Sequence, residues 1–234
     1  LYLIILDLVF TFLTSSNIKR KCDVIVGMPH IKFPCHCVYW TQVKDHENIK
    51  SKLVPIIHNL ITENNYDNPF KKDCTMTTNF SEKTDFLDNE MKDKIIWKCL
   101  QEMVSETNCF TFLKTTNAKI TEYWFNVYEK GDFQEMHQHR GLPSIIDGKR
   151  YDTTFSIIYI LNSDEEENST VFKLTDTAIP FHPLMQPVEF DTSKVDEIKE
   201  GTILIFSNQL NHFVRPIKKS GRITIAFNVA CCFE

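Results

Sequence analysis

The chain has 234 residues, of which 42% are hydrophobic and 24% charged, as is typical of a globular protein that buries a sizeable core. The formal net charge of −5 argues against a basic surface, so nucleic acid is not an expected partner. One domain of this length is possible if β-structure dominates, because β-sandwiches and barrels commonly reach this size. We therefore expect a single domain over residues 23–234.

Residues 1–22 are an uncertain N-terminal extension. They begin with the apolar run Leu1–Leu13, which is shorter than a transmembrane helix and is interrupted by Asp7. The basic residues Lys19–Lys21 follow this run, whereas a secretory signal carries its basic residues first. A signal anchor, a terminal strand or helix, and a non-native extension all stay open. We expect no membrane association unless residues 1–13 act as an anchor.

The eight cysteines do not show the paired spacing of a zinc site. Several lie in apolar stretches, where a reduced thiol packs as a small hydrophobic group. Cys35, His36 and Cys37 form a short potential metal-binding fragment, but no second cluster in the sequence complements it. Cysteines without a disulfide framework favour a reducing compartment, so we expect the protein to be cytoplasmic.

A short strand-like stretch is followed by the segment 45–107, in which apolar residues recur at helical spacing. Asp45 is a candidate N-cap for an amphipathic helix of about 18 residues, and a second helix is expected over Leu87–Val104. The polar residues 64–84 predict a long loop between them. Both helices carry an apolar stripe that indicates packing against a sheet. The stripes are Ile49, Leu53, Ile56, Ile57, Leu60 and Ile61 in the first helix, and Met91, Ile95, Ile96, Cys99, Leu100 and Met103 in the second.

The apolar period becomes strand-like from residue 118 to residue 234. Turn-forming residues separate short candidate strands at a spacing that is typical of a sandwich or barrel. The overall class is therefore mainly β with supporting helices (α+β), with two N-terminal helices packed on one face. The expected strands are Lys119–Tyr128, Thr154–Leu161, Thr170–Leu174, Val188–Phe190, Thr202–Phe206, Phe213–Ile217 and Arg222–Val229.

Two histidines end the aromatic-rich segment Trp124–Arg140. His137 and His139 are one residue apart, so an extended backbone directs both imidazoles to the same side. Histidine is the commonest side-chain ligand of transition metals, and two converging histidines form half of a metal site.

A third histidine and an arginine complete a possible site near the C-terminus. His212 precedes an expected strand, and Arg222 begins the next one across a Ser-Gly turn. We expect this hairpin to bring His212 and Arg222 onto neighbouring strands of one sheet. In the last strand Arg222, Thr224 and Asn228 share one face, while the alternate apolar residues can pack under the helices. The guanidinium of arginine matches a carboxylate, so this face resembles the wall of an anion pocket.

The second half of the chain resembles the double-stranded β-helix, or jelly-roll, core of the iron(II)- and 2-oxoglutarate-dependent oxygenases, which include the prolyl hydroxylases. Within that superfamily it is most similar to a branch common in marine phage and bacterial genomes. The resemblance rests on four sequence segments that occur in the expected order: WFNVYEKGDFQEMHQH, TFSIIYILN, GTILIFSNQLNHFVRPI and GRITIAFN.

The resemblance implies roles for particular residues. His137 would be the first iron ligand and His212 the distal one. Arg222 would pair with the far carboxylate of 2-oxoglutarate, and Thr224 and Tyr128 would contribute to the cosubstrate pocket. No catalytic residue beyond the metal ligands is expected.

The sequence departs from the superfamily pattern at two places. His139 stands where most members have Asp or Glu, so it either binds the metal as a third imidazole or lies beside it without binding. Ile160 stands where relatives often have a cosubstrate-binding Tyr, and Tyr159 faces the other way; Ser156 or Tyr128 could supply that contact, or it is lost.

The sequence thus predicts an iron(II)- and 2-oxoglutarate-dependent oxygenase, a hydroxylase whose small-molecule or peptidyl substrate is unknown. Two alternatives stay open. One is a cupin-like three-histidine dioxygenase that works without 2-oxoglutarate, and the other is a non-catalytic jelly-roll binding module. The segment Gly141–Asp152 is expected to be a loop, either a substrate lid or a surface loop without a role.

Overall fold

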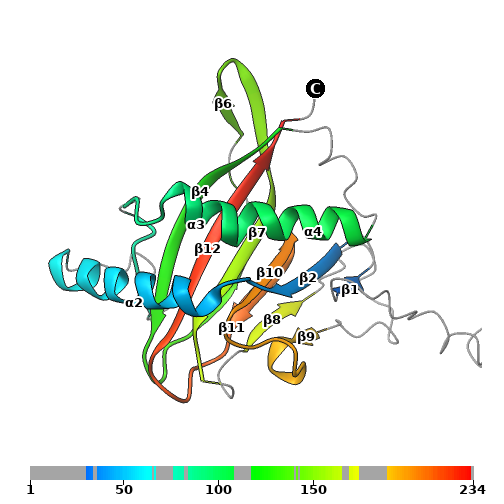
Figure 1. Ribbon diagram of the computed structural model, residues 1–234. Coiled ribbons are helices and arrows are strands. Elements are labelled where there is room, and N and C mark those ends of the chain that lie inside the picture. The colour runs from blue at the N-terminus through cyan, green and yellow to red at the C-terminus, as the bar shows by residue number, and fades with distance from the viewer. Residues whose placement is uncertain are drawn as a thin grey trace, which may run out of the picture.

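The computed structural model describes residues 30–33, 36–64, 66, 76–81, 84–107, 117–139, 141, 143–164, 169–173 and 189–232. These residues form two antiparallel sheets and a helical layer (Figure 1). The larger sheet has eight strands, three of which come from the N-terminal half of the chain. In spatial order they are β1 (His30–Phe33), β2 (His36–Gln42), β10 (Thr202–Ser207), β7 (Lys149–Asn162), β12 (Arg222–Cys231), β4 (Ala118–Tyr128) and β3 (Thr77–Thr78), with β6 (Ser144–Ile146) paired to β7.

The smaller sheet has four strands and packs against the opposite face of the larger sheet from the helices. A cluster of buried residues joins the sheets, with Ile158, Leu204 and Phe206 from one and Phe172 and Phe190 from the other. Two facing antiparallel sheets are the arrangement of a jelly-roll, so the predicted fold class is confirmed. The order of the smaller sheet is β5 (Gln134–His137), β11 (Asn211–Val214), β8 (Thr170–Lys173) and β9 (Glu189–Asp191).

The helices cover one face of the larger sheet (Figure 1). They are α2 (His46–Glu63) and a continuous segment made of α3 (Asn89–Lys92), the π-helical turn Asp93–Trp97 and α4 (Lys98–Thr107). All six stripe residues of the second helix are buried, which confirms the predicted packing. No helix in the described part of the chain is long and apolar enough to cross a membrane.

Strand β12 separates the two layers of the core as its alternation predicts. Ile223, Ile225, Phe227 and Val229 belong to the cluster under the helices. The alternate residues face the space between the two sheets, where β12 is fully buried. This central strand therefore fixes which of its side chains can reach a site inside the jelly-roll.

Several local predictions were wrong. Asp45 occupies the N-cap position of α2 as expected, but its side chain forms no capping hydrogen bond, because Asp45 has a left-handed backbone and its carboxylate instead accepts hydrogen bonds from Asn48 and Lys94. Ile56 is 37% exposed, outside the buried stripe. The polar segment 64–84 contains the short strand β3, paired with β4.

The segment Gly141–Asp152 is not a plain loop. Within it β6 pairs with the start of β7, and the turn between them is the Asp147-Gly148 pair, both with positive φ. The resulting β6–β7 hairpin projects beyond the sheet (Figure 1). The predictions for residues 1–22 concern residues outside the described ones, as do Cys35 and the His36 side chain of the Cys35–Cys37 fragment, whereas Cys37 is described and is a free cysteine.

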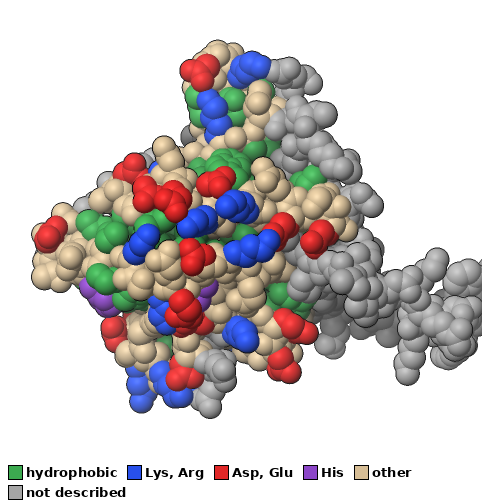
Figure 2. All heavy atoms as spheres, in the orientation of Figure 1, with side chains coloured by type: hydrophobic (Ala, Val, Ile, Leu, Met, Phe, Trp, Pro, Cys, Tyr) green, Lys and Arg blue, Asp and Glu red, His purple; other side chains and the backbone are tan. Residues whose placement is uncertain are grey.

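Acidic and basic side chains are interspersed over the helical face (Figure 2). Several of them form exposed ion pairs, such as Lys94 with Glu90 and Lys44 with Glu102. Such pairs contribute little to stability in water. Because charges of both signs alternate over it, this face carries no concentrated charge patch of one sign.

Candidate metal centre

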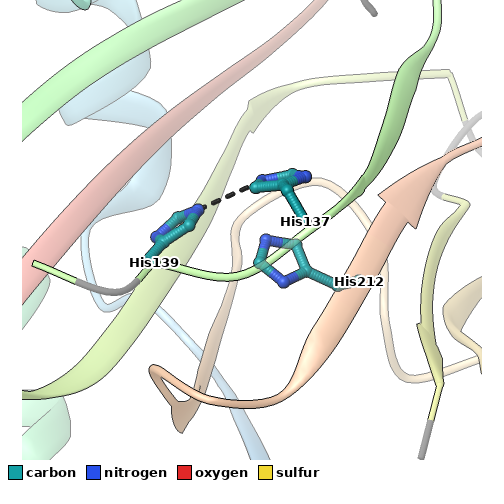
Figure 3. Close-up of side chains that lie close together, drawn as sticks. All are labelled: His137, His139 and His212. Carbon is teal, nitrogen blue, oxygen red and sulfur yellow. Dashed lines mark hydrogen bonds between the residues drawn. The ribbon is translucent and has the colours of Figure 1, made fainter. Parts of the chain in front are cut away.

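Three histidines converge at one end of the space between the sheets (Figure 3). His137 is the last residue of β5, and His212 lies opposite it on β11 as its register partner. His139 follows just beyond β5, where its backbone N–H donates to the carbonyl of Asn208 at 3.1 Å. One ring nitrogen from each histidine lies within 4.8 Å of the others, which is close enough for one ion to bind all three.

The backbone orients two of the three imidazoles. Nδ1 of His137 lies 2.7 Å from the carbonyl oxygen of Glu135, and Nδ1 of His212 lies 3.1 Å from that of Leu210. A carbonyl oxygen only accepts, so each Nδ1 must carry the proton. In the neutral ring the Nε2 atom then keeps its lone pair, which is the form that binds a metal.

The third imidazole is oriented by a side chain. Nδ1 of His139 lies 3.1 Å from Oδ1 of Asn228, and its Nε2 lies 3.2 Å from Nε2 of His137 (Figure 3). With both Nδ1 atoms protonated, two lone pairs face each other, an arrangement that a bound cation would stabilise. Metal–nitrogen bonds of about 2.1 Å separate neighbouring ligands of an octahedron by about 3.0 Å. The residues present therefore fit a metal ion.

Burial keeps these imidazoles neutral. The pKa of His212 lies well below the ordinary value, first because of burial and then because of the neighbouring imidazoles. Burial also lowers the pKa of His137, and it lowers that of His139 to about 3. Aromatic rings supply much of this dry environment, with Trp124 beside His139 and Phe206 beside His212. At neutral pH all three histidines can donate a lone pair.

Arg222 lies in the interior near this cluster and is only 1% exposed. Its Nη2 donates to Oγ1 of Thr170 at 3.0 Å, and its guanidinium lies 5.1 Å from the ring centre of Tyr128. A buried positive charge in a cavity is suited to an anionic ligand, since its desolvation is best offset by a carboxylate. The predicted neighbours Tyr128 and Thr224 are buried as well and line the same cavity.

The expected arrangement of His212 and Arg222 in one sheet was wrong. β11 belongs to the smaller sheet and β12 to the larger one, because β11 pairs with β5 and β8. The two residues still line one interior cavity, since the sheets face each other. The site is thus built across the sandwich rather than along a single sheet.

Two connected spaces adjoin the histidines. The inner cavity, which reaches Arg222 and Thr224, measures about 10 Å³, about the room that one water molecule needs. The outer cavity measures about 550 Å³ and also contacts His137 and His139. A cosubstrate next to Arg222 would therefore require the lining side chains to move apart, whereas the outer cavity is already open to a ligand.

Several polar residues in these cavities had no role predicted from the sequence. Asn126 and Gln134 line both spaces, while Glu122 and Asn228 line the outer one. Oδ1 of Asn126 is buried without a hydrogen-bond partner. The period-2 alternation of the strands could have indicated Asn126, which shares a face with Tyr128, and Asn228, which shares a face with Arg222.

Comparison with known proteins gives an independent result. The family described as "Putative 2OG-Fe(II) oxygenase" matches residues 122–228, a span that contains every residue of the site described above. No curated protein matches the chain.

Solved structures of similar fold are also found. SnoK, a non-haem α-ketoglutarate-dependent carbocyclase from nogalamycin biosynthesis, is 8% identical, with 82% of this chain and 79% of that chain covered and a TM-score of 0.52. A Pseudomonas putida prolyl-4-hydroxylase is 16% identical over 83% of this chain and 92% of that one, with a TM-score of 0.48. A prolyl hydroxylase from Trichoplax adhaerens is 14% identical over 83% and 82%, with a TM-score of 0.49. At 8% identity, the likeness to SnoK concerns the fold alone.

Proposed function

Residues 122–228 belong to the 2OG-Fe(II) oxygenase family, and on this premise we propose that the protein is a hydroxylase whose iron(II) is bound by His137, His139 and His212. Its cofactors are iron(II) and the cosubstrate 2-oxoglutarate. The observation that carries the assignment of ligands is the convergence of three neutral imidazoles beside a buried arginine. Three neutral ligands leave the ion its full positive charge, which favours an anionic cosubstrate.

Arg222 would hold the far carboxylate of 2-oxoglutarate. Burial supports this role, because a guanidinium interacts with a carboxylate far more strongly in a dry cavity than in water. Tyr128 and Thr224 would line the cosubstrate's path. The Tyr128 hydroxyl lies 3.2 Å from Oε1 of Gln134, and Oγ1 of Thr224 lies 3.5 Å from Nδ2 of Asn126. Both contacts would have to rearrange for the inner cavity to widen.

When bound, iron(II) and 2-oxoglutarate supply the activation of O2 that oxidises a substrate C–H bond, with succinate and CO2 as the coproducts. The protein holds the reacting groups in place and keeps water away from them. His212 is buried, whereas His137 and His139 border the outer cavity. A small molecule or a peptide side chain in that cavity would therefore approach the metal from the side of His137 and His139.

The domain and its location are part of the same proposal. Residues 23–234 would form one oxygenase domain, with the helices of 45–107 bracing the core of 118–234, and residues 1–22 would be an extension. The four cysteines that the structure describes are free, and burial raises the pKa of Cys99 to about 12. Free cysteines, including a buried thiol of this kind, suit a reducing compartment such as the cytoplasm.

Two observations favour a second candidate, a three-histidine dioxygenase that acts without 2-oxoglutarate. The metal would have no carboxylate ligand, and the inner cavity is too small for the cosubstrate without rearrangement. Arg222 would then hold a carboxylate of the substrate itself.

Turnover of 2-oxoglutarate tests the proposal and separates the candidates. Protein purified without air and loaded with iron(II) should convert 2-oxoglutarate to succinate, and His212→Ala should abolish this reaction because it removes a buried ligand. Undiminished succinate formation in that variant would refute the assignment of ligands. A wild-type protein that consumes O2 with a substrate but forms no succinate would support the second candidate.

A further inference from the structure

His139 differs from the other two histidines in how its ring is held. His137 and His212 each use a backbone carbonyl oxygen two residues earlier in the sequence, Glu135 within β5 and Leu210 directly before β11. His139 lies beyond the end of β5 and uses the side chain of Asn228, which comes from β12 in the opposite sheet. The orientation of this one ring therefore depends on a residue far away in the sequence.

Asn228 is the middle member of a row of three polar residues across the larger sheet. Its register partners are Glu122 on β4 and Ser156 on β7, so all three side chains stand on the same face. Nδ2 of Asn228 donates to Oε2 of Glu122 at 3.0 Å, and Oγ of Ser156 lies 3.5 Å from Oδ1 of Asn228. The β12–β4 register shifts directly after Asn228, an irregularity of the kind that redirects side chains near functional sites.

Glu122 decides which way the Asn228 amide faces. A carboxylate oxygen accepts hydrogen bonds, so the amide NH2 group must turn towards Glu122. The amide oxygen is then left for His139, whose Nδ1 must carry the proton to donate to it. As a consequence, the lone pair of His139 is on Nε2, the atom that lies beside Nε2 of His137. Asn228 is 4% exposed, so water competes little for these contacts.

We propose that Asn228 is the positioning residue that makes His139 a metal ligand, and that Glu122 fixes the Asn228 amide in the required orientation. The inference rests on the proposed metal site. The hydrogen-bonded series Glu122–Asn228–His139 forms a relay. Its last member, His139, stands where a carboxylate ligand would otherwise bind the metal. An acceptor behind a metal-bound histidine fixes its tautomer and makes it a stronger donor. Through the relay, the Glu122 carboxylate influences the metal by orienting Asn228 and His139, without being a ligand itself.

Cobalt(II) binding to the metal-free protein tests the proposal, since cobalt(II) reports on its ligands through absorption and through shifted proton resonances. Asn228→Ala should weaken cobalt(II) binding by about 10-fold to 100-fold. It should also remove one of three exchangeable imidazole N–H resonances from the spectrum of the cobalt(II) form. In a His139→Ala background, Asn228→Ala should have no further effect on affinity, because the two residues act as one unit. Equal losses in both backgrounds would overturn the proposal.

Two further variants guard against trivial outcomes. Asn79→Ala removes another buried asparagine, whose Oδ1 accepts from the backbone N–H of Phe125 and which lines neither cavity, and it should leave cobalt(II) affinity unchanged. Glu122→Gln preserves volume and should produce the same changes as Asn228→Ala at smaller amplitude, even if Asn228→Ala does not fold.

The failure of this inference is distinguishable from the failure of the proposed function. If the wild-type protein binds no cobalt(II), the metal site itself is absent and both are wrong. If binding requires His137 and His212 but is unaffected by Asn228→Ala and Glu122→Gln, the metal site stands and the relay alone is refuted.

Discussion

Arg222→Ala is the substitution that most sharply tests the cosubstrate assignment. The guanidinium is 1% exposed, and it is held by Thr170 and by the ring of Tyr128. Removing one partner of a buried charge pair costs about 2–4 kcal/mol, which corresponds to about 30-fold to 900-fold in binding. The concentration of 2-oxoglutarate needed for half-maximal succinate formation should rise by a factor in this range. Iron(II) affinity should change little, because Arg222 is not one of the ligands.

Arg215 offers a matched control for this experiment. Its side chain is 50% exposed, and its ion pairs with Glu189 and Asp191 are 3.6 Å and 3.5 Å long. Arg215 lines neither of the cavities beside the histidines, so Arg215→Ala should leave the 2-oxoglutarate requirement unchanged. If Arg222→Ala also leaves it unchanged while iron(II) still binds, the far carboxylate does not bind at Arg222 and the assignment is refuted.

Two further predictions concern stability. Burial lowers the pKa of all three histidines below the unfolded value of about 6.5. As the pH falls from that value towards about 3, only the unfolded chain takes up these protons. The metal-free protein should therefore be most stable above a pH of about 6.5 and lose stability as the pH falls. The urea midpoint should fall between pH 7.5 and pH 5, and less steeply in His139→Leu; equal slopes would contradict this. Tyr159→Phe removes a 2.6 Å contact between its hydroxyl and Nδ1 of His46, on the helical side of the sheet, and should cost about 0.5–1.5 kcal/mol in unfolding free energy without changing succinate formation. A loss of turnover in that variant would show that the helical face influences the site.

The alternating orientation of side chains along β12 was sufficient to predict which of its residues face the site. Arg222, Thr224 and Asn228 share a face because a strand repeats every two residues, and the burial of both faces of β12 follows from its central place in the sheet. The same rule separated Tyr159, under the helices, from Ile160, which faces the smaller sheet. Local periodicity was sufficient here because each conclusion concerned only one strand.

Pairing between strands could not be predicted in the same way. A hairpin between β11 and β12 was the shorter connection, yet β11 pairs with β5 and β8 in the other sheet. The choice depends on contacts between distant parts of the chain, which periodicity does not encode. The role of Asn228 was missed for the same reason, since its partners His139 and Glu122 come from other strands.

The ligand count at the metal is the most direct test of the central claim. X-ray absorption spectra of the iron(II)-loaded protein, compared with those of His139→Ala, report how many imidazoles bind the ion. The structure brings one ring nitrogen each from His137, His139 and His212 within 4.8 Å of one another. We predict three imidazole ligands in the wild-type protein and one fewer in the variant. Identical spectra for the two proteins would contradict the three-histidine centre.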